Sequence, residues 1–476
     1  MVGRDMAGRE QRPNKPPDER WFDQDDEPVP PRKKTSVERK RDAEELARKI
    51  KEARWNHPYV FSAILLCVLL SLLFVLAFMR DEPLPWEADL KWPTPLQTEP
   101  PISAPLRMKT LLFSAQTLKA DTLRSKPFWQ WDTPALSKLM DERCMVLDNL
   151  RDLLEDKEDE WQPHHVMWMK EDLGDHPAWP SVILMKQAEV AYLHRRGLEE
   201  SAFRAAADMA VLAGLMERIN AWPSLMDRAL ELHESSALSL AELLRNTQLS
   251  EDKLRQLQVE EYQPWIASIE NLSQSMRGFY AYERKLLLGP DVGEPPLPPG
   301  YVPARSGWLL FKPNATLRLF TDSFRELKDE TLLPPLSRSN QFASRLLSSA
   351  NAFSNPNSSG EDYYSRRFRP YADLPDQVYL ARTRHAMVVT LFALRRYVMK
   401  EFRVPQKLEE LVPNYLPAVP RDPFSHEPLK YNPARGIIYS VGVNLKDDGG
   451  RPTAIPMSDA TEPTVETGIG VARVGP

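Results

Sequence analysis

The chain of 476 residues is poor in cysteine and shows no strong excess of one charge. Its two cysteines are Cys67 and Cys144, so a network of disulfides of the kind that staples small secreted domains is excluded. Lysine and arginine number 62 against 67 for aspartate and glutamate, which gives a net charge of −5. A nucleic-acid-binding domain usually carries a basic surface, so we expect no nucleic-acid partner.

Sequence motifs that are typical of catalytic sites are also missing. The sequence has no Gly-x-Ser-x-Gly, no His-Glu-x-x-His, no glycine-rich phosphate loop and no paired-cysteine metal motif. Ser250 and Lys253 match Ser-x-x-Lys, but acidic residues directly after Ser250 are typical of a helix N-cap. We therefore predict no catalytic residue, and an N-cap role for Ser250.

One short stretch gathers side chains that bind metals. It contains His164, His165, Asp172, Asp175 and His176, with tryptophans on both sides. The spacing follows no known metal site, and a polar loop anchored by the tryptophans is the favoured interpretation. Cys144 lies among Leu139, Met140 and Leu147 at helical spacing, which predicts a buried, unreactive thiol.

The strongest positive signal is an uncharged apolar run from Tyr59 to Met79, which is long enough to cross a bilayer as a helix. A cleavable signal peptide would be shorter and nearer to the N-terminus, so we expect a permanent anchor. Basic residues crowd the segment before Tyr59, whereas few follow Met79. The positive-inside rule then predicts a cytoplasmic N-terminus and an external C-terminal part.

Small side chains recur every four residues within this run, at Ala63, Cys67 and Ser71. Such a face lets two membrane helices approach closely, so one alternative is a homodimer through the span. The other alternative is a helix that faces lipid on all sides. With only Cys144 outside the span, the external part would carry no disulfide, as is common in the bacterial periplasm.

Segment composition divides the rest of the chain. Residues 1–34 are rich in proline and charge and should be disordered, and a charged juxtamembrane helix should cover 35–58, with Thr35 and Glu38 as a capping box. Prolines predict an extended stalk over 80–105, and apolar residues at helical spacing predict an antiparallel helical array over 106–288.

The following segments are less regular. A Pro/Gly linker is expected over 289–312, and a helix capped by Asn314 and then mostly loop over 313–375. A long helix with Met387, Leu391, Leu394 and Val398 on one side should open a C-terminal block over 376–452, and 453–476 should be flexible.

The C-terminal block has the pattern of a helix followed by a hairpin. Pro405 can open a short helix that carries Leu408 and Leu411, and later prolines prevent a long one. Alternation over 429–431 and again over 437–441 predicts two strands, with turn-forming residues at 432–436 between them.

The motifs of this block fall in a familiar order. Val404-Pro405, Tyr415, Asp422-Pro423-Phe424, Tyr439-Ser440 and Gly449-Gly450 follow one another along the chain. This order resembles the globular tail of the major pseudopilin of bacterial type II secretion systems. The resemblance implies a calcium site in the loop after Tyr439, for which Asn444, Asp447 and Asp448 are the candidate ligands. A solvated acidic turn is the alternative. No prepilin leader precedes the span, so we expect no pilin-like processing.

A second resemblance covers most of the part beyond the span. An Ala/Leu-rich helical middle is followed by Phe311-Lys312-Pro313-Asn314, then Asn355-Pro356, and then the long helix. This arrangement resembles uncharacterised membrane-anchored proteins of planctomycete and verrucomicrobial bacteria. That family implies no chemistry.

Together these patterns predict a mainly α protein of the bacterial inner membrane. It should have a single transmembrane helix, a periplasmic antiparallel helical array and a small α+β pseudopilin-like cap with a β-hairpin, called the C-terminal cap below (residues 376–452). The expected function is non-catalytic, as an interaction or assembly component that binds envelope proteins, linked to a secretion or pilus-like system. The alternative is a periplasmic hydrolase with an unrecognised site in the helical domain. No cofactor is expected apart from the calcium ion.

Overall fold

A computed structural model describes residues 35–56, 58–90, 104–116, 128–155, 173–219, 222–289, 310–333, 335, 355–450 and 463–467. The chain forms two compact units, residues 1–77 and residues 78–476. The expected disordered tail, the region around His164 and His165, and most of the Pro/Gly linker lie outside the described residues.

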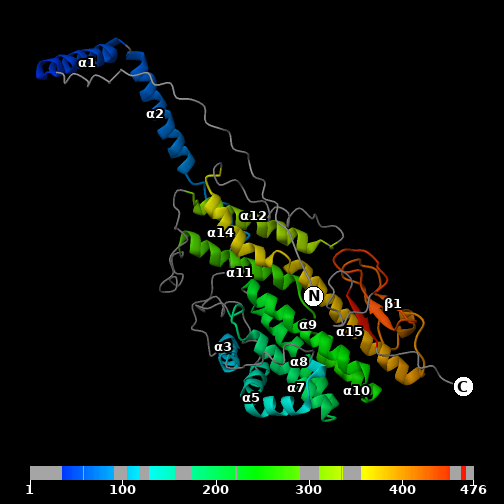
Figure 1. Ribbon diagram of the computed structural model, residues 1–476. Coiled ribbons are helices and arrows are strands. Elements are labelled where there is room, and N and C mark those ends of the chain that lie inside the picture. Colours follow the sequence, from blue (N-terminus) through cyan, green and yellow to red (C-terminus); the bar gives the residue numbers. More distant parts are fainter. Residues whose placement is uncertain are drawn as a thin grey trace, which may run out of the picture. The chain divides into compact units, whose positions relative to one another are not determined.

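The described part of unit 1 consists of two helices (Figure 1). Helix α1 spans Ser36–Asn56, and the predicted capping box forms, since Thr35 N donates to Glu38 Oε2 (2.8 Å) and Glu38 N to Thr35 Oγ1 (3.4 Å). Helix α2 spans Pro58–Met79. Its segment Tyr59–Leu76 is long and apolar enough to cross a membrane, and none of that segment is buried within the protein.

The described part of unit 2 is mainly helical. Its helices are α3 (Ala104–Ala115), η1 (Phe128–Gln130), α5 (Thr133–Leu154), α7 (Trp179–Arg195), α8 (Glu199–Arg218), α9 (Pro223–Arg245), α10 (Glu251–Gln256), the π-helical turn η3 (Leu257–Tyr262), α11 (Ile269–Leu288), α12 (Pro313–Leu332), α14 (Ser358–Phe368), η5 (Arg369–Tyr371), α15 (Leu374–Glu401) and η6 (Leu408–Leu411). The helical array expected from sequence is confirmed, and Ser250 is the N-cap of α10, its Oγ accepting from Lys253 N (3.4 Å).

Short connections join α7 to α8 and α8 to α9, and each pair packs side by side, which makes the neighbours antiparallel. Alanine-rich faces let these helices approach closely. Gly214 on α8 shows the same effect, because a Cβ atom there would lie 2.5 Å from the Trp265 ring. Small residues therefore occupy positions on these helices where a large side chain from another segment packs.

Helix α15 is the central element of unit 2. Its first part contributes Leu374 and Val378 to an aromatic-rich core shared with α11, α12 and α14. Its second part contributes Met387, Leu391 and Leu394 to a larger core shared with α3, α5 and α7 to α9. The same larger core includes residues of the C-terminal cap, among them Leu408 and Ile438. The cap is therefore built into the core of unit 2.

The predicted hairpin forms at the end of this helix. Strands β1 (Lys430–Asn432) and β2 (Ile437–Tyr439) pair antiparallel, with Tyr431 opposite Ile438. A third strand, β3 (Thr464–Glu466), pairs with the other edge of β2. Residues 464–466 thus belong to the sheet, which corrects the expected flexible C-terminus. An ion pair of 2.5 Å between Arg245 on α9 and Glu466 fastens this strand.

The segment 80–90 differs most from expectation. In place of a free stalk, it packs along α11 and α12. Glu87 is buried, accepts from Tyr280 Oη (2.9 Å) and pairs with Arg284 Nε (2.9 Å). Asp89 pairs with Arg325 (2.8 Å), and Leu90 enters the aromatic-rich core. We call residues 81–90 the clamp, because they bind the start of unit 2 to its own helices.

The clamp also explains how α12 begins. Asp81 accepts from the backbone N–H groups of Asn314 (2.9 Å) and Ala315 (3.2 Å), so a carboxylate more than two hundred residues away serves as the N-cap. Asn314 was expected to cap this helix itself. Its side chain instead donates to the Glu82 carbonyl (2.8 Å), because Pro313 already starts the helical turn.

Two further expectations are wrong. The segment predicted as loop before residue 376 contains helix α14, which Glu283 of α11 holds: this fully buried carboxylate accepts from Tyr363 Oη (2.6 Å) and pairs with Arg367 (2.6 Å). Cys144 is exposed on α5, because the buried face of that helix is the one that carries Val146 and Leu150. Apolar neighbours in sequence did not reveal which face packs.

Candidate functional site

Two of the motifs in the C-terminal cap are joined at Asp422. This carboxylate is 2% exposed, and its Oδ1 accepts from Ser440 Oγ (2.8 Å) and Phe424 N (3.0 Å). Its Oδ2 accepts from Val441 N (3.0 Å) and Ser425 Oγ (3.3 Å). A buried carboxylate is stable only when its oxygens are bonded in this way. The Asp-Pro-Phe turn and the Tyr-Ser segment are therefore one unit.

Phe424 attaches that unit to α15. Its ring is fully buried and lies 5.9 Å from the ring of Tyr379, in a small cluster with Leu380 and Val441. Arg396, on the same helix, is also buried. It donates from Nε to Glu251 (2.7 Å) and from Nη1 to Gln258 (3.1 Å), which joins α15 to α10 and η3. The cap and the helical array are thus fixed to one another through α15.

The junction between α15 and the rest of the cap is held by Glu410. Its carboxylate accepts from Tyr397 Oη (2.8 Å), Arg403 Nη1 (2.6 Å) and the backbone N–H of Gln406 (2.7 Å). The hydrogen bond from Tyr397, followed by that from Arg403, lowers the pKa of Glu410 to about 2. The loop between Glu401 and Leu408 is therefore anchored on its inner side.

Phe402 lies in this anchored loop and points away from it. Its side chain is 90% exposed, and its backbone has φ of 53° at the C-cap of α15. Glycine usually occupies this left-handed position, which costs other residues about 1 kcal/mol. No sequence signal marks the residue, because neither its exposure nor its backbone angle can be read from the chain.

In the candidate calcium loop, side-chain oxygens of Asn444 and Asp447 make hydrogen bonds within the chain. Asn444 Oδ1 accepts from Lys446 N (3.0 Å), and Asp447 Oδ1 accepts from Gly449 N (3.1 Å). Asp447 Oδ2 lies 2.8 Å from Lys430 Nζ, and this hydrogen bond lowers the pKa of Asp447. Asp448 follows in the same turn. Among the described residues there is no group of three His, Cys, Asp or Glu side chains suited to a metal ion. Calcium binding stays a prediction.

The other sequence candidates are separated in the fold. Lys253 Nζ pairs with Glu200 (3.2 Å), so Ser250 has only its N-cap role among the contacts seen. His164, His165 and Asp172 lie outside the described residues. His176 Nδ1 accepts from the backbone of Ala178 (3.2 Å), and its ring contacts Phe113 edge-on, while Asp175 lies in the turn before it.

A buried polar pair that the sequence did not reveal lies between α8 and α9. His233 Nε2 is 3.1 Å from Glu217 Oε1, and Glu217 Oε2 accepts from the backbone of Ser268 (2.9 Å) at the start of α11. Nearby, the His385 ring stacks on Tyr262 with centroids 4.7 Å apart, and burial lowers the pKa of His385 to about 4. The only signal in the sequence is polar residues inside apolar helical stripes.

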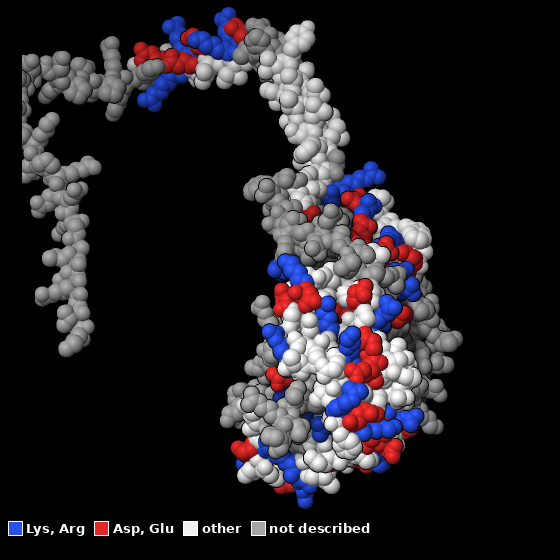
Figure 2. Space-filling model, turned by 90° about the vertical axis from the view of Figure 1, so that its right-hand side faces the viewer, with Lys and Arg blue, Asp and Glu red and all other residues white. Residues whose placement is uncertain are grey.

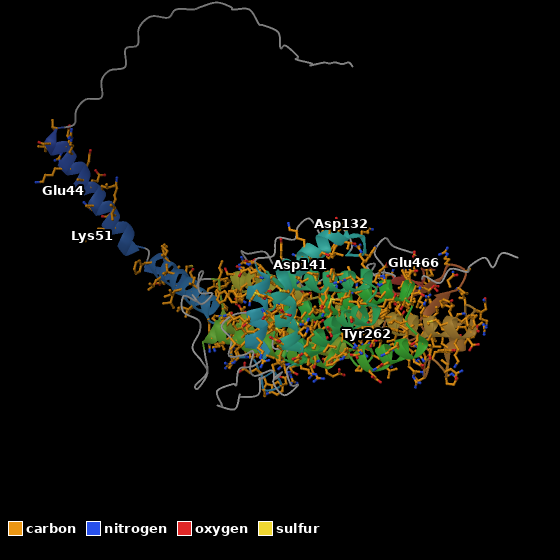
Figure 3. All side chains as sticks on the ribbon, turned by 90° about the horizontal axis from the view of Figure 1, so that it is seen from below. Glu44, Lys51, Asp132, Asp141, Tyr262 and Glu466 are labelled. Carbon is orange, nitrogen blue, oxygen red and sulfur yellow. The ribbon has the colours of Figure 1, made fainter. Side chains whose placement is uncertain are left out.

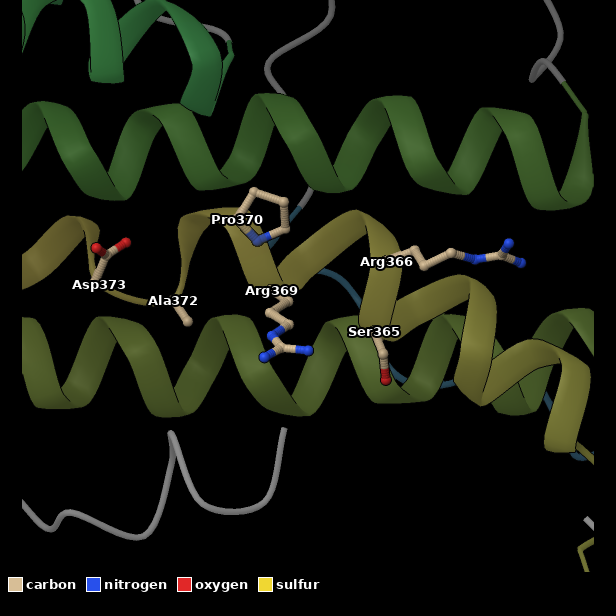
Figure 4. A pocket seen from close by; sticks show the side chains of 6 residues that line it. All are labelled: Ser365, Arg366, Arg369, Pro370, Ala372 and Asp373. Atoms are coloured by element: carbon tan, nitrogen blue, oxygen red, sulfur yellow. The ribbon is translucent and has the colours of Figure 1, made fainter. Parts of the chain in front are cut away.

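An enzyme would need space beside such groups. Unit 2 has an open surface depression of about 460 Å³ between α14 and α15, lined by Ser365, Arg366, Arg369, Pro370, Ala372 and Asp373 (Figure 4). It contains neither His233 nor His385, and its arginines are exposed. This depression therefore does not combine open space with either of these two histidines.

No family model, curated protein or solved structure matches this chain. The two resemblances stated from sequence motifs stay predictions.

Proposed function

We propose that this protein is a single-pass protein of the bacterial inner membrane that works by binding another envelope protein through the end of α15. Helix α2 would be the anchor, with the N-terminus in the cytoplasm and unit 2 in the periplasm. The basic residues before Tyr59 support this orientation. The partner would be a component of a secretion or pilus-like system.

The observation that carries the proposal is Phe402. A single exposed apolar residue needs no explanation, but this one combines 90% exposure with a left-handed backbone. The left-handed backbone costs stability, and at 90% exposure the ring has little contact with the described residues to offset that cost. Strained residues of this kind persist where function requires them, and a rigidly presented aromatic ring is a common anchor of protein interfaces.

The surroundings of Phe402 suit an interface. Lys400, Glu401 and Arg403 are exposed around it and would form the polar rim, while Tyr397 and Glu410 hold the loop from inside. Elsewhere, basic and acidic side chains alternate over the face of unit 2 in Figure 2. That mixture gives no field of one sign for a polyanion, which supports a protein partner over nucleic acid.

The test replaces Phe402 by glycine. Glycine adopts the left-handed conformation without strain, so Phe402→Gly should leave the fold intact or stabilise it by about 1 kcal/mol. Proteins that copurify with the wild-type chain from native membranes should be lost with this variant. Met145→Ala, which removes another exposed apolar side chain, is the matched control and should keep them.

Partners that remain bound to Phe402→Gly would refute docking at this position. Deletion of residues 404–450 would be a poor test, because it would uncover the buried face of α15. If the purified protein instead turns over a peptide, glycan or ester substrate, the hydrolase alternative replaces the proposal.

A further inference from the structure

Helix α1 lies directly beside the apolar span in sequence. It ends at Asn56, and α2 begins at Pro58, so one residue separates them. Pro58 has no backbone N–H to continue the helical hydrogen bonds, which explains why the two helices are distinct. If α2 crosses a membrane, as proposed above, the C-terminal end of α1 must lie at the surface of that membrane.

One side of α1 is apolar and uncovered. Ala43, Leu46, Ala47 and Ile50 follow at spacings of three and four residues. Leu46 is 60% exposed and Ile50 is 59% exposed. This stripe covers about two turns, which is too short for a coiled coil, since those need three or more heptads.

The charges of α1 are graded toward the span. Before Leu46 the helix contains Glu38, Asp42, Glu44 and Glu45, whereas Glu52 is the only acid after it. The same second half contains Arg48, Lys49, Lys51 and Arg54. Figure 2 shows these charged residues giving way to a helix without charge. The half nearest to the span therefore has a net positive charge.

A second argument comes from where the charged residues lie around the axis of α1. At 100° per residue, Lys40 and Lys51 flank one side of the stripe and Lys49 the other, about 70 to 110° from its centre. Of the acids, Glu45 and Glu52 lie about 150° or more from the centre, whereas Asp42 and Glu44 lie about 90 to 110° from it, one on each flank. Figure 3 labels Lys51 and Glu44 on this helix. Exposed pairs such as Lys49 with Glu45 (2.9 Å) are weak and do not prevent contact with another anion.

We propose that α1 lies along the anionic surface of the membrane that α2 crosses. Leu46 and Ile50 rest at the boundary of the acyl chains, and Lys40, Lys49 and Lys51 reach the phosphates of the lipid headgroups beside them. A short apolar stripe with lysines on both flanks is the arrangement that interfacial helices use. A second copy of α1 is the competing occupant, and the short stripe disfavours it.

The test uses the full chain in nanodiscs, with Cys67→Ala and Cys144→Ser to remove the native thiols. An environment-sensitive fluorophore is attached through Ala43→Cys on the stripe, through Glu45→Cys on the opposite side, or through Leu69→Cys within α2. In discs of phosphatidylcholine with phosphatidylglycerol, spin-labelled lipid should quench position 43 and not position 45. Discs of phosphatidylcholine alone should weaken the quenching at position 43.

Charge variants sharpen the result. Replacing Lys40, Lys49 and Lys51 by glutamine should lower the lipid-bound population about fivefold for each lysine. Replacing Glu44, Glu45 and Glu52 by glutamine is the matched control and should not lower it. Equal, water-like emission at positions 43 and 45 in anionic discs overturns the inference, as does energy transfer between two copies that is independent of lipid charge. The fluorophore at position 69 distinguishes failure of this inference from failure of the proposed function. If spin-labelled lipid does not quench it, α2 does not cross the membrane and the proposed anchor is refuted.

Discussion

Ser440 Oγ donates a hydrogen bond of 2.8 Å to Asp422 Oδ1, although the two residues belong to different motifs of the C-terminal cap. The bond is buried, and the same carboxylate accepts from the backbone of Val441. Asp422 therefore closes the turn before β1 against the end of β2.

The first prediction concerns this carboxylate. Asp422→Ala leaves buried donors of Ser440 and Val441 without an acceptor, and each unsatisfied group costs about 1 to 3 kcal/mol. We expect the free energy of unfolding to fall by about 3 kcal/mol or more in urea titrations. Glu409→Gln, an exposed acid of the same cap, should change it by less than about 0.5 kcal/mol. Similar losses for both variants would contradict the role given to Asp422.

The second prediction concerns the clamp. Glu87→Gln leaves the largely buried Arg284 without its charged partner, and breaking such a pair costs about 3 kcal/mol. Faster hydrogen exchange over residues 81–90 should accompany the loss. Glu82 forms an ion pair with Arg318, and the two side chains are 45% and 43% exposed. Glu82→Gln should therefore lower the free energy of unfolding by less than about 1 kcal/mol. An unchanged exchange rate in Glu87→Gln would mean that the clamp does not depend on this pair.

The third prediction concerns pH. Burial lowers the pKa of His385 to about 4, whereas a free histidine titrates near pH 6.5. The unfolded chain therefore takes up the proton first as the pH falls. The contribution of this neutral histidine to stability is present above about pH 6.5 and is lost between about pH 6.5 and 4, by roughly 3 kcal/mol.

His385→Gln should flatten the pH dependence of the unfolding free energy in that window. The control is His426→Asn, since His426 is exposed and asparagine tolerates its positive φ of 60°. A slope that is unchanged in His385→Gln would show that another group titrates there.

The fourth prediction concerns calcium. Because Lys430 neutralises Asp447, we expect the melting temperature of the wild-type chain to be the same in calcium and in chelator. Lys430→Ala removes the competing cation and should create a calcium-dependent rise, which Asp447→Ala in the same chain abolishes. A rise in the wild type that Asp447→Ala removes would instead establish the site expected from the pseudopilin resemblance.

The fifth prediction concerns the span. If Ala63, Cys67 and Ser71 form a contact between two copies, leucine at positions 67 and 71 should abolish the dimer signal of a membrane two-hybrid reporter carrying the full chain. The native residues Leu65 and Leu69 lie on other faces of the helix, and their replacement by isoleucine is the control. A signal that survives the first pair of changes would leave α2 as a lipid-facing helix.

Some features were determined by the sequence itself, because their causes are local. Twenty uncharged residues after Tyr59 require a long apolar helix, Thr35 and Glu38 close a capping box three residues apart, and residues 432–436 turn one strand into the next. Ser250 could be recognised as an N-cap for the same reason. In each case the interacting groups lie within a few positions of one another.

Other features depend on groups that only the tertiary structure brings together. Asp81 caps α12 from a distance no pattern can reveal, and Arg245 fastens a third strand formed by residues 464–466. Cys144 is exposed because a different face of α5 packs against the core. Glu283 holds helix α14, in a segment that was expected to be a loop. Phe402, on which the proposed function depends, is distinguished only by its exposure and its backbone angle. These properties arise from the sum of contacts across the whole unit, and no single stretch of sequence contains them.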